Sequence, residues 1–267
     1  MNRMLDNLPK YALWLALALL VWLAIAVFGP KFGLIDWKTG FGFMTVTAGP
    51  ILMAIVAVAA LVALLVAFLQ KPRGAWWKAA LALAIPVVLF AGLLQVRARG
   101  EEVPPIHDVA TDLRNPPEFS ADTMAMREEF GANPLNDYGT PLGELDMWKE
   151  RVEGDMAIRN HADIIAGDYG DLQPIPVGAA TRGEAIDAVV AAMGEIGLAD
   201  IRADREAGRV EGTAETFAYG FKDDVVARVT DSRIDLRSVS RVGVSDLGYN
   251  AERLRDLSDA IEDRLGS

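Results

Sequence analysis

The chain has 267 residues, no cysteine and a formal net charge of −11. Residues 1–99 hold 9 Lys or Arg and 2 Asp or Glu, a balance of +7, whereas residues 100–267 hold 17 and 35, a balance of −18. The composition excludes disulfides, thiol nucleophiles and cysteine-linked lipid anchors. A strongly acidic part repels phosphate backbones, so we expect no nucleic-acid partner. Two histidines leave little for a metal site, and we expect no metal and no cofactor.

Three apolar runs, at about residues 11–28, 44–69 and 75–96, predict transmembrane helices. Each provides close to the ~20 residues that a helix needs to cross a ~30 Å hydrocarbon core. Their interiors carry no Asp, Glu, Lys, Arg or His, which argues against an ion-coupled pump. Ala59, Ala63 and Ala67 recur at helical spacing, and this pattern favours either packing among the three helices or docking to another membrane protein.

The basic residues beside the runs predict the orientation. One side carries five of them (Arg3, Lys10, Lys71, Arg73 and Lys78), and the other carries four (Lys31, Lys38, Arg97 and Arg99). Because the more basic side stays in the cytoplasm, the N-terminus is expected inside and the acidic part outside. In a bacterium this predicts an inner-membrane protein whose C-terminal domain, residues 100–267, lies in the periplasm.

The acidic part predicts an α+β domain. Residues 100–180 are rich in Pro and Gly breakers, with one helix expected at 145–166. Thr181 and Glu184 form a capping box for a helix that ends before Gly197. Strands are predicted at 198–204, 209–219, 224–230 and 233–242, with a further short strand at 172–177. A final helix carries Leu254, Leu257, Ile261 and Leu265 on one face. The expected fold is three transmembrane helices (residues 1–99), then an antiparallel sheet of four to five strands with helices on one face.

Several segments of the acidic part resemble the domain of unknown function family 1499. Residues 220–229 read GFKDDVVARV, and residues 234–253 read IDLRSVSRVGVSDLGYNAER, close to the family pattern for two strands and the start of a helix. Residues 106–112 (IHDVATD), 169–175 (YGDLQPI) and 207–214 (AGRVEGTA) are also similar, although Gly170 stands where the family usually has Pro. The resemblance covers about residues 106–265, and residues 121–161 depart from it. The family has no agreed activity, so the resemblance implies a bacterial envelope setting and little chemistry.

The candidate site lies on and after the strand at 233–242. Arg237 and Arg241 share one strand face because side chains alternate, and Glu211 lies on the matching face of a neighbouring strand. One interpretation is a solvated ladder of cross-strand ion pairs. The other is an anion site in which guanidinium groups and the start of the last helix bind one phosphate or carboxylate. The candidate ligand-binding residues are Arg237, Ser238, Ser240, Arg241, Ser245, Asp246, Asn250 and Arg253; no catalytic residue is assigned.

Two shorter motifs have local structural explanations. Asp246 or Asn250 can cap the last helix, with Gly248 taking a positive φ. His107 and Asp108 could serve as an acid–base pair or a weak metal site, but we favour a local turn formed by Asp108 and Thr111.

Three functional hypotheses follow from these features. The first is a membrane-anchored, non-catalytic accessory or interaction protein of the bacterial envelope, with the lipid bilayer and another membrane protein or complex as its partners. The second is a domain that binds an anion or a lipid headgroup. The third is a hydrolase, for which the sequence offers no convincing pair of nucleophile and base.

Overall fold

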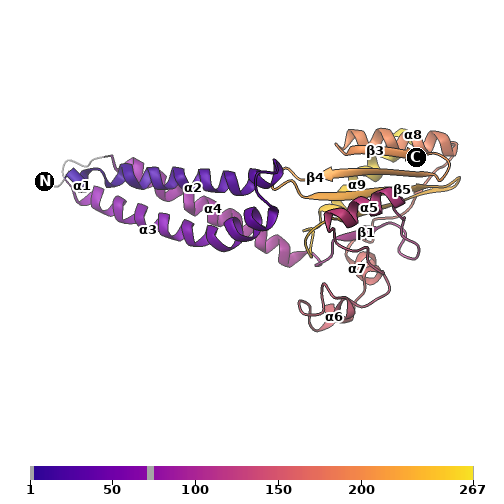
Figure 1. Cartoon of the computed structure of the whole chain (residues 1–267), viewed down its shortest axis with the longest axis horizontal. Coiled ribbons are helices and arrows are strands. Elements are labelled where there is room, and N and C mark those ends of the chain that lie inside the picture. Colours follow the sequence, from indigo (N-terminus) through magenta and orange to yellow (C-terminus); the bar gives the residue numbers. More distant parts are fainter. Residues whose placement is uncertain (1–2, 71–74, 267) are drawn as a thin grey trace. The chain divides into compact units, whose positions relative to one another are not determined.

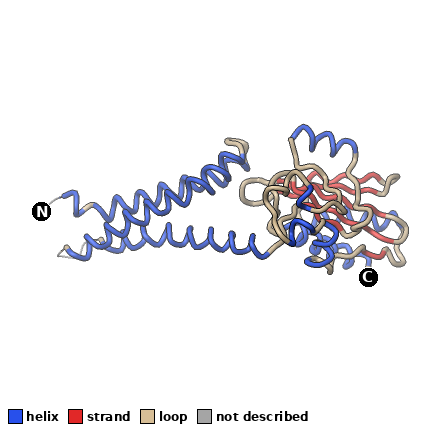
Figure 2. Tube along the Cα trace, turned by 90° about the horizontal axis from the view of Figure 1, so that it is seen from below, coloured by secondary structure: helices blue, strands red, loops and turns tan. Residues whose placement is uncertain are grey.

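The computed structural model describes residues 3–70 and 75–266, and the chain divides into two compact units. The first comprises Met1–Arg99 together with Phe217–Gly220, and the second comprises Gly100–Thr216 and Phe221–Ser267. Among the described residues, every strand belongs to the second unit, whereas the first consists of helices and loops (Figure 2).

The first unit contains the three helices expected from the apolar runs. After the short α1 (Arg3–Asp6), they are α2 (Leu8–Lys31), the continuous pair η1 (Lys38–Thr47) and α3 (Ala48–Leu69), and α4 (Trp76–Glu102). In the most apolar stretch of 18 residues in each span, the mean hydropathy is 2.5, 3.1 and 2.4. At 1.5 Å per residue, even α2 extends for about 36 Å, so each helix is long enough to cross a bilayer.

The second span begins at Lys38, before the apolar run predicted at about residues 44–69. The additional residues belong to η1, a π-helix of mixed composition. Its glycines and threonines lower the local hydropathy, which conceals the segment in the sequence. The Thr45 and Thr47 hydroxyls donate to the carbonyls of Gly40 and Gly42, both at 3.0 Å. These bonds help to satisfy backbone oxygens where the α-helical pattern is interrupted.

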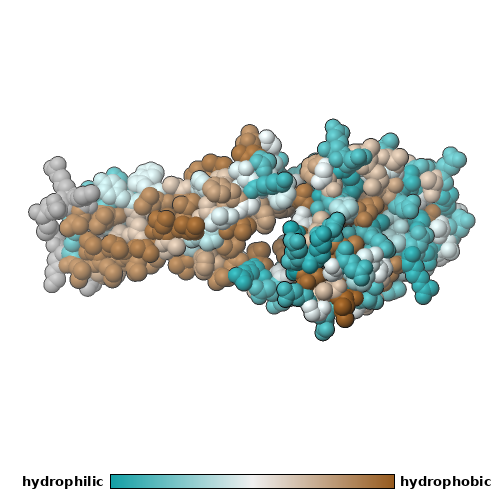
Figure 3. Space-filling view, turned by 60° about the horizontal axis from the view of Figure 1, so that its bottom comes forward, coloured by the Kyte–Doolittle hydropathy of each residue, from teal (hydrophilic) through white to brown (hydrophobic). Residues whose placement is uncertain are grey.

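Small residues fill the interior of the helical unit. Ala60, Ala63 and Ala67 of α3 are buried, and Ala59 is half-buried. Ala12 and Ala16 of α2 and Ala79 and Ala82 of α4 belong to the same apolar cluster. Small side chains let helix backbones approach closely in a bilayer, and the larger Leu, Val and Phe side chains point outward. The surface of this unit is accordingly mostly hydrophobic, in contrast to that of the second unit (Figure 3).

An antiparallel sheet forms the centre of the second unit (Figure 1). Its strands follow the order β1 (Asp108–Ala110), β6 (Arg233–Ser240), β5 (Lys222–Val229), β4 (Arg209–Glu215) and β3 (Ala199–Asp204). The short β2 (Ile175–Pro176) also pairs with β6, beyond the end of β1. Strands β3 to β6 match the four longer predicted strands, and β2 lies within the short strand predicted at 172–177. Strand β1 was not predicted because three residues give no periodic pattern.

Helices lie on both faces of this sheet. The helices α8 (Arg182–Glu195) and α9 (Tyr249–Leu265) cover the apolar face and complete the main core. Thr181 and Glu184 form the predicted capping box of α8, and Gly197 follows it with a φ of +82°. The predicted layer of helices is therefore present. In addition, the short α5 (Ala121–Phe130) packs on the opposite, polar face, through side-chain contacts to β4 and β5.

The prediction of a single helix at residues 145–166 was wrong. This region contains turns, with η2 (Leu142–Glu144) before them and two short helices, α6 (Asp155–Ile158) and α7 (His161–Asp168), after them. Gly154 has a φ of +58°, which interrupts any continuous helix. The turns surround Trp148, whose ring is buried and whose Nε1 donates to the carbonyl of Pro105. A long-range contact therefore decides the conformation here, against the local helical pattern.

Candidate functional site

Strand alternation divides the predicted site residues between the two faces of the sheet. Arg237 and Arg241 point to the face that carries α5, whereas Ser238 and Ser240 point to α9. Arg237 is paired with Val226 of β5, and Ser238 with Val225, so the division continues across the neighbouring strand. The eight predicted residues therefore do not line one pocket, and each face has its own polar cluster.

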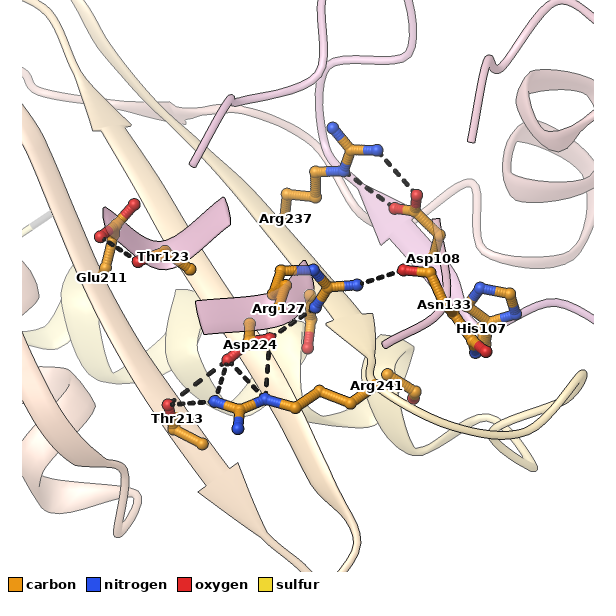
Figure 4. Close-up of polar contacts among 12 residues, drawn as sticks. His107, Asp108, Thr123, Arg127, Asn133, Glu211, Thr213, Asp224, Arg237 and Arg241 are labelled. Carbon is orange, nitrogen blue, oxygen red and sulfur yellow. Dashed lines mark hydrogen bonds and ion pairs between the residues drawn. The ribbon is translucent and has the colours of Figure 1, made fainter. Parts of the chain in front are cut away.

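Arg237 forms a buried, bidentate ion pair with Asp108 of β1 (Figure 4). Its Nε donates to Asp108 Oδ1 at 2.9 Å and its Nη2 to Oδ2 at 2.7 Å. The Tyr138 hydroxyl donates to Oδ1 at 2.7 Å, and the Asn136 amide donates to Oδ2 at 3.1 Å. Burial alone would raise the pKa of Asp108, but Arg237, Tyr138 and Asn136 together hold this pKa below its usual value. The pair is thus fully ionised and its carboxylate is saturated with donors.

The explanation of Asp108 as part of a local turn with Thr111 was therefore wrong. Asp108 lies in β1 and reaches across to β6, while the Thr111 hydroxyl accepts from the amide of Leu236 at 2.8 Å. The local turn is made instead by Asp112, whose Oδ1 accepts from the amides of Arg114 and Asn115, both at 3.1 Å. The sequence did not show which of these two aspartates forms the local turn, because each has a hydroxyl or a turn-forming residue nearby.

Arg241 shares a second buried carboxylate with α5 (Figure 4). Asp224 of β5 accepts from Arg241 Nη2 at 2.7 Å and from Arg127 Nη1 at 2.5 Å. Arg127 also donates to the carbonyl of Asn133 at 2.8 Å. The third carboxylate on this face, that of Glu211, accepts from the hydroxyls of Ser120 and Thr123, each at 2.7 Å.

The interpretation as a ladder of ion pairs is correct in that Arg237 and Arg241 pair with carboxylates of neighbouring strands. It is wrong about the solvent, since the pairs are buried, and about Glu211, which lies on β4 and pairs with neither arginine. Arg127, Arg237 and Arg241 face Asp108, Asp224 and Glu211, so the charges balance, and each of the six residues is buried. The segment 113–139, including α5, covers them. Residues 121–139 of this segment depart from the family pattern recognised in the sequence, and nothing local indicated that the segment closes over the sheet.

The other predicted residues form a cluster between β6 and α9. Ser238 Oγ donates to Asn250 Oδ1 at 2.7 Å, and Asn250 Nδ2 donates to Ser240 Oγ at 3.0 Å. Arg253 Nη1 donates to Ser238 Oγ at 3.0 Å, while its Nη2 donates to Asp223 Oδ2 at 2.7 Å. Asn250 Nδ2 also donates to the carbonyl of His107 at 2.9 Å. These bonds join α9 to three strand segments.

Asp246 caps α9, as one of the two predicted candidates. Its carboxylate accepts from the amides of Gly248 at 2.9 Å and Asn250 at 2.7 Å, and Gly248 takes a φ of +82°. Burial raises the pKa of Asp246 to about 6, although the two amide bonds oppose the shift. Ser245 is used locally as well, since its Oγ accepts from the amide of Leu247 at 3.2 Å. The backbone amides of Gly248, Tyr249, Asn250 and Glu252 at the start of this helix are thus bonded within the protein.

An aromatic cluster around Trp148 was not predicted from the sequence. The His107 ring stacks on Trp148 with centroids 5.2 Å apart, and His161 meets the same ring edge-on at 5.1 Å. Tyr138 stacks on His161 at 5.5 Å. Burial lowers the pKa of His161 to about 4 and also lowers that of His107. Both rings are therefore neutral at pH 7, and neither nitrogen of His161 has a hydrogen-bond partner among the described residues.

These arrangements hold the fold of the second unit together. The described residues include no cluster of His, Asp and Glu with the arrangement of a metal site. A cavity of about 720 Å³ borders Arg237 and Tyr138, between residues 113–119 and 135–139. Arg237 itself is nearly covered.

The fold and the polar clusters define a membrane-anchored α+β protein whose second unit is held together by buried ion pairs. The model of a family described as proteins of unknown function, DUF1499, matches residues 108–261, more than half of the chain. The chain therefore belongs to this family. No curated protein and no solved structure matches it.

Proposed function

We propose that this chain is a membrane-anchored, non-catalytic accessory protein of the bacterial envelope. The observation that carries the proposal is that these polar side chains, in the segments that resemble the family, already have ionic or hydrogen-bond partners within the protein. Arg237 and Arg241 are bonded to Asp108 and Asp224, and Asn250 is bonded to Ser238 and Ser240. A catalytic site needs a nucleophile, acid or base that is free to reach a substrate. Here these side chains stabilise a rigid unit that can be displayed to a partner.

The exposed surface of α4 supports a partner within the membrane. In the most apolar window of this helix, 17% of the residues are buried inside the protein, against 33% for α2. Ala82 faces the other helices and is fully buried, whereas Val88 is 68% exposed. Lipid alone can cover such a face, but the same face also allows a helix of another membrane protein to pack against it.

The basic residues support a periplasmic position for the second unit. The count of five against four favours a cytoplasmic position for the more basic side, and with three spans it supports a position of residues 100–267 on the opposite side. Lys71 and Arg73, two of the five, lie outside the described residues. The extracytoplasmic position therefore rests on the number of spans and on the sequence.

The second hypothesis, an anion bound by Arg237 and Arg241, is less favoured by this geometry. An anion would have to displace a carboxylate that already makes two bonds to each guanidinium. Leaving Asp108 or Asp224 buried without its partner would cost several kcal/mol. A hydrolase is less favoured again, because no Ser, Asp or His described above forms a nucleophile–base pair.

The proposal is tested by photocrosslinking in native membranes. A photoreactive amino acid is placed at Val88, on the exposed face of α4, and at Ala82 as the matched buried control. We expect one discrete adduct with a membrane protein from position 88 and none from position 82. The same protein should co-purify in mild detergent at a fixed ratio. A monodisperse monomer with lipid adducts alone would contradict the proposal.

A further inference from the structure

We propose that the connection between β4 and β5 is a membrane-contacting loop, in which Phe217 inserts among lipids at the interface between bilayer and water. The proposal is independent of the accessory function proposed above and of the orientation of the chain. In the sequence, Phe217–Gly220 lie between two strands of the second unit, but in the structure they belong to the helical unit. The surroundings of the transmembrane helices are therefore also the surroundings of this loop.

Three contacts hold the loop on the end of α2 and on η1. The amide of Tyr219 donates to the carbonyl of Val27 at 3.0 Å, and the Tyr219 hydroxyl donates to Thr45 Oγ1 at 3.0 Å. The ring of Phe217 meets that of Phe28 edge-on, with centroids 5.6 Å apart. Non-helical backbone is tolerated at the edge of a bilayer only where its polar groups are bonded within the protein, and both polar contacts of Tyr219 meet this condition.

The backbone of the loop is adapted to a close approach to α2. Tyr219 has a φ of +64°, which is uncommon for a residue with a side chain, and Gly220 follows with a φ of +63°. A Cβ at Gly220 would lie 2.8 Å from the Cα of Lys31, so only glycine allows this approach. A left-handed tyrosine persists where surrounding contacts hold it, and the bonds to Val27 and Thr45 do so here.

Phe217 continues a stripe of exposed apolar side chains along α2. Val21, Ile25 and Phe28 recur at spacings of four and three residues, so they share one face of the helix. Val21 is 60% exposed and Ile25 is 51% exposed, as expected of side chains that face lipid. Phe217 lies against Phe28 at the end of this stripe and is itself 77% exposed. Its ring is thus continuous with the lipid-facing surface of a transmembrane helix, which favours the bilayer over water as its surroundings.

The position of Phe28 in α2 places the Phe217 ring near the interface. The apolar run of α2 ends at Phe28, three residues before the helix ends at Lys31. Three residues span about 4.5 Å of helix axis, so the ring lies close to the boundary between hydrocarbon and head groups. Lys31 Nζ lies 5.6 Å from the centroid of this ring. An ammonium beside an aromatic ring fits this depth, where lysine side chains extend toward the head groups.

The test measures the depth of a spin label on the full chain in lipid nanodiscs. The chain has no cysteine, so Phe217→Cys, Ile25→Cys and Ala207→Cys each provide a single label. Oxygen concentrates in the bilayer and a nickel chelate concentrates in water, so the ratio of their collision rates with the label reports its depth. Ala207 lies in the exposed turn at the other end of β4 and is the matched control.

We expect the collision ratio at position 217 to approach that at the lipid-facing position 25 and to exceed that at position 207 several-fold. A ratio at position 217 equal to that at position 207 would overturn the proposal. Protection of position 217 from both reagents would overturn it as well, because protein and not lipid would then cover the ring.

Two glycine variants test whether the contact with α2 positions the ring. Gly220→Ala places a Cβ against Lys31 and should lower the collision ratio at position 217 several-fold, because the loop can no longer approach α2. Gly178→Ala is the matched control, since Gly178 has a φ of +65° but open space around its Cβ, and it should leave the ratio unchanged. An unchanged ratio in Gly220→Ala would overturn the assigned role of the contact with α2.

Because the spin label removes the ring of Phe217, a second measurement keeps an aromatic side chain there. Benzoylphenylalanine at position 217 in native membranes should form adducts with lipid on irradiation, and the same group at position 207 should not. Adducts at position 217 with another protein and none with lipid would overturn the bilayer as the partner of this loop. The accessory function is tested separately at Val88 of α4, so the two proposals can fail independently.

Discussion

Asp108 and Arg237, which lie 129 positions apart in the chain, form a buried, bidentate ion pair. The pair attaches β1 to β6 and positions Tyr138. The Tyr138 hydroxyl donates to Asp108, and the Tyr138 ring lies against the guanidinium of Arg237. One contact therefore joins β1, β6 and the segment that covers the polar face. Its contribution to stability is directly measurable.

Arg237→Gln should reduce the free energy of unfolding of the second unit by about 3–5 kcal/mol, because Asp108 remains buried without its counter-charge. Hydrogen exchange of the β5 and β6 amides in the full chain measures this loss. The double variant Asp108→Leu, Arg237→Met should recover part of it, since no charge is then left unpaired. A loss below about 1 kcal/mol for Arg237→Gln would indicate an ordinary surface pair instead.

Asp224→Asn should destabilise the second unit more than Arg241→Gln does. The first change leaves both Arg127 and Arg241 buried without a carboxylate, whereas the second leaves Asp224 paired with Arg127. Because the two arginines share one partner, Arg127→Gln and Arg241→Gln should be non-additive by about 0.5–3 kcal/mol. Hydrogen exchange of the same strands gives all four free energies, and strict additivity would contradict the shared site.

Acid should destabilise the second unit through His161. Burial lowers the pKa of this histidine to about 4 in the folded protein, from 6.5 for an unperturbed histidine. Between these values the unfolded chain binds more protons, so stability is full above about pH 6.5 and falls as the pH drops towards 4. The maximal loss is about 3 kcal/mol. The raised pKa of Asp246 opposes this trend, since that group favours the folded state as the pH falls below about 6.

Comparison with His161→Phe isolates the histidine contribution. The variant keeps an aromatic ring beside Trp148 and Tyr138, and the difference between the two proteins removes the effect of Asp246. When the pH falls from 7 to 4, the free energy of unfolding of the variant should decrease less than that of the wild type. Fluorine NMR of Trp148 labelled with 5-fluorotryptophan follows this unit in the full chain. A difference independent of pH would refute the assignment.

Labelling of an introduced cysteine tests the predicted orientation. The chain has no cysteine, and Ala207 lies exposed in the turn between β3 and β4. Ala207→Cys should react with a membrane-impermeant maleimide in cells whose outer membrane is permeabilised. The cysteine-free parent is the control for background. If labelling requires disruption of the inner membrane, the second unit is cytoplasmic and the five-to-four basic count is misleading.

The sequence by itself determined the parts of this protein that depend on local pattern. The three spans are visible as apolar runs, and α8 is marked by its capping box and by Gly197. Strands β3 to β6 follow from alternation and turn residues, and the family was recognisable because its motifs lie in these regular elements. The capping role of Asp246 was also predictable, since its partners lie within four residues.

The tertiary structure decided which polar residues meet. Asp108 and Arg237, or Arg127 and Asp224, lie about a hundred positions or more apart, and nothing in the neighbourhood of either partner specifies the other. The sequence placed Arg237 and Arg241 on one strand face, but it could not show that α5 and residues 113–139 cover that face. The same holds for residues 145–166, where burial of Trp148 outweighs helical periodicity. Local propensities amount to tenths of a kcal/mol per residue, whereas burying an indole or an unpaired charge involves several kcal/mol, so long-range packing determined the site.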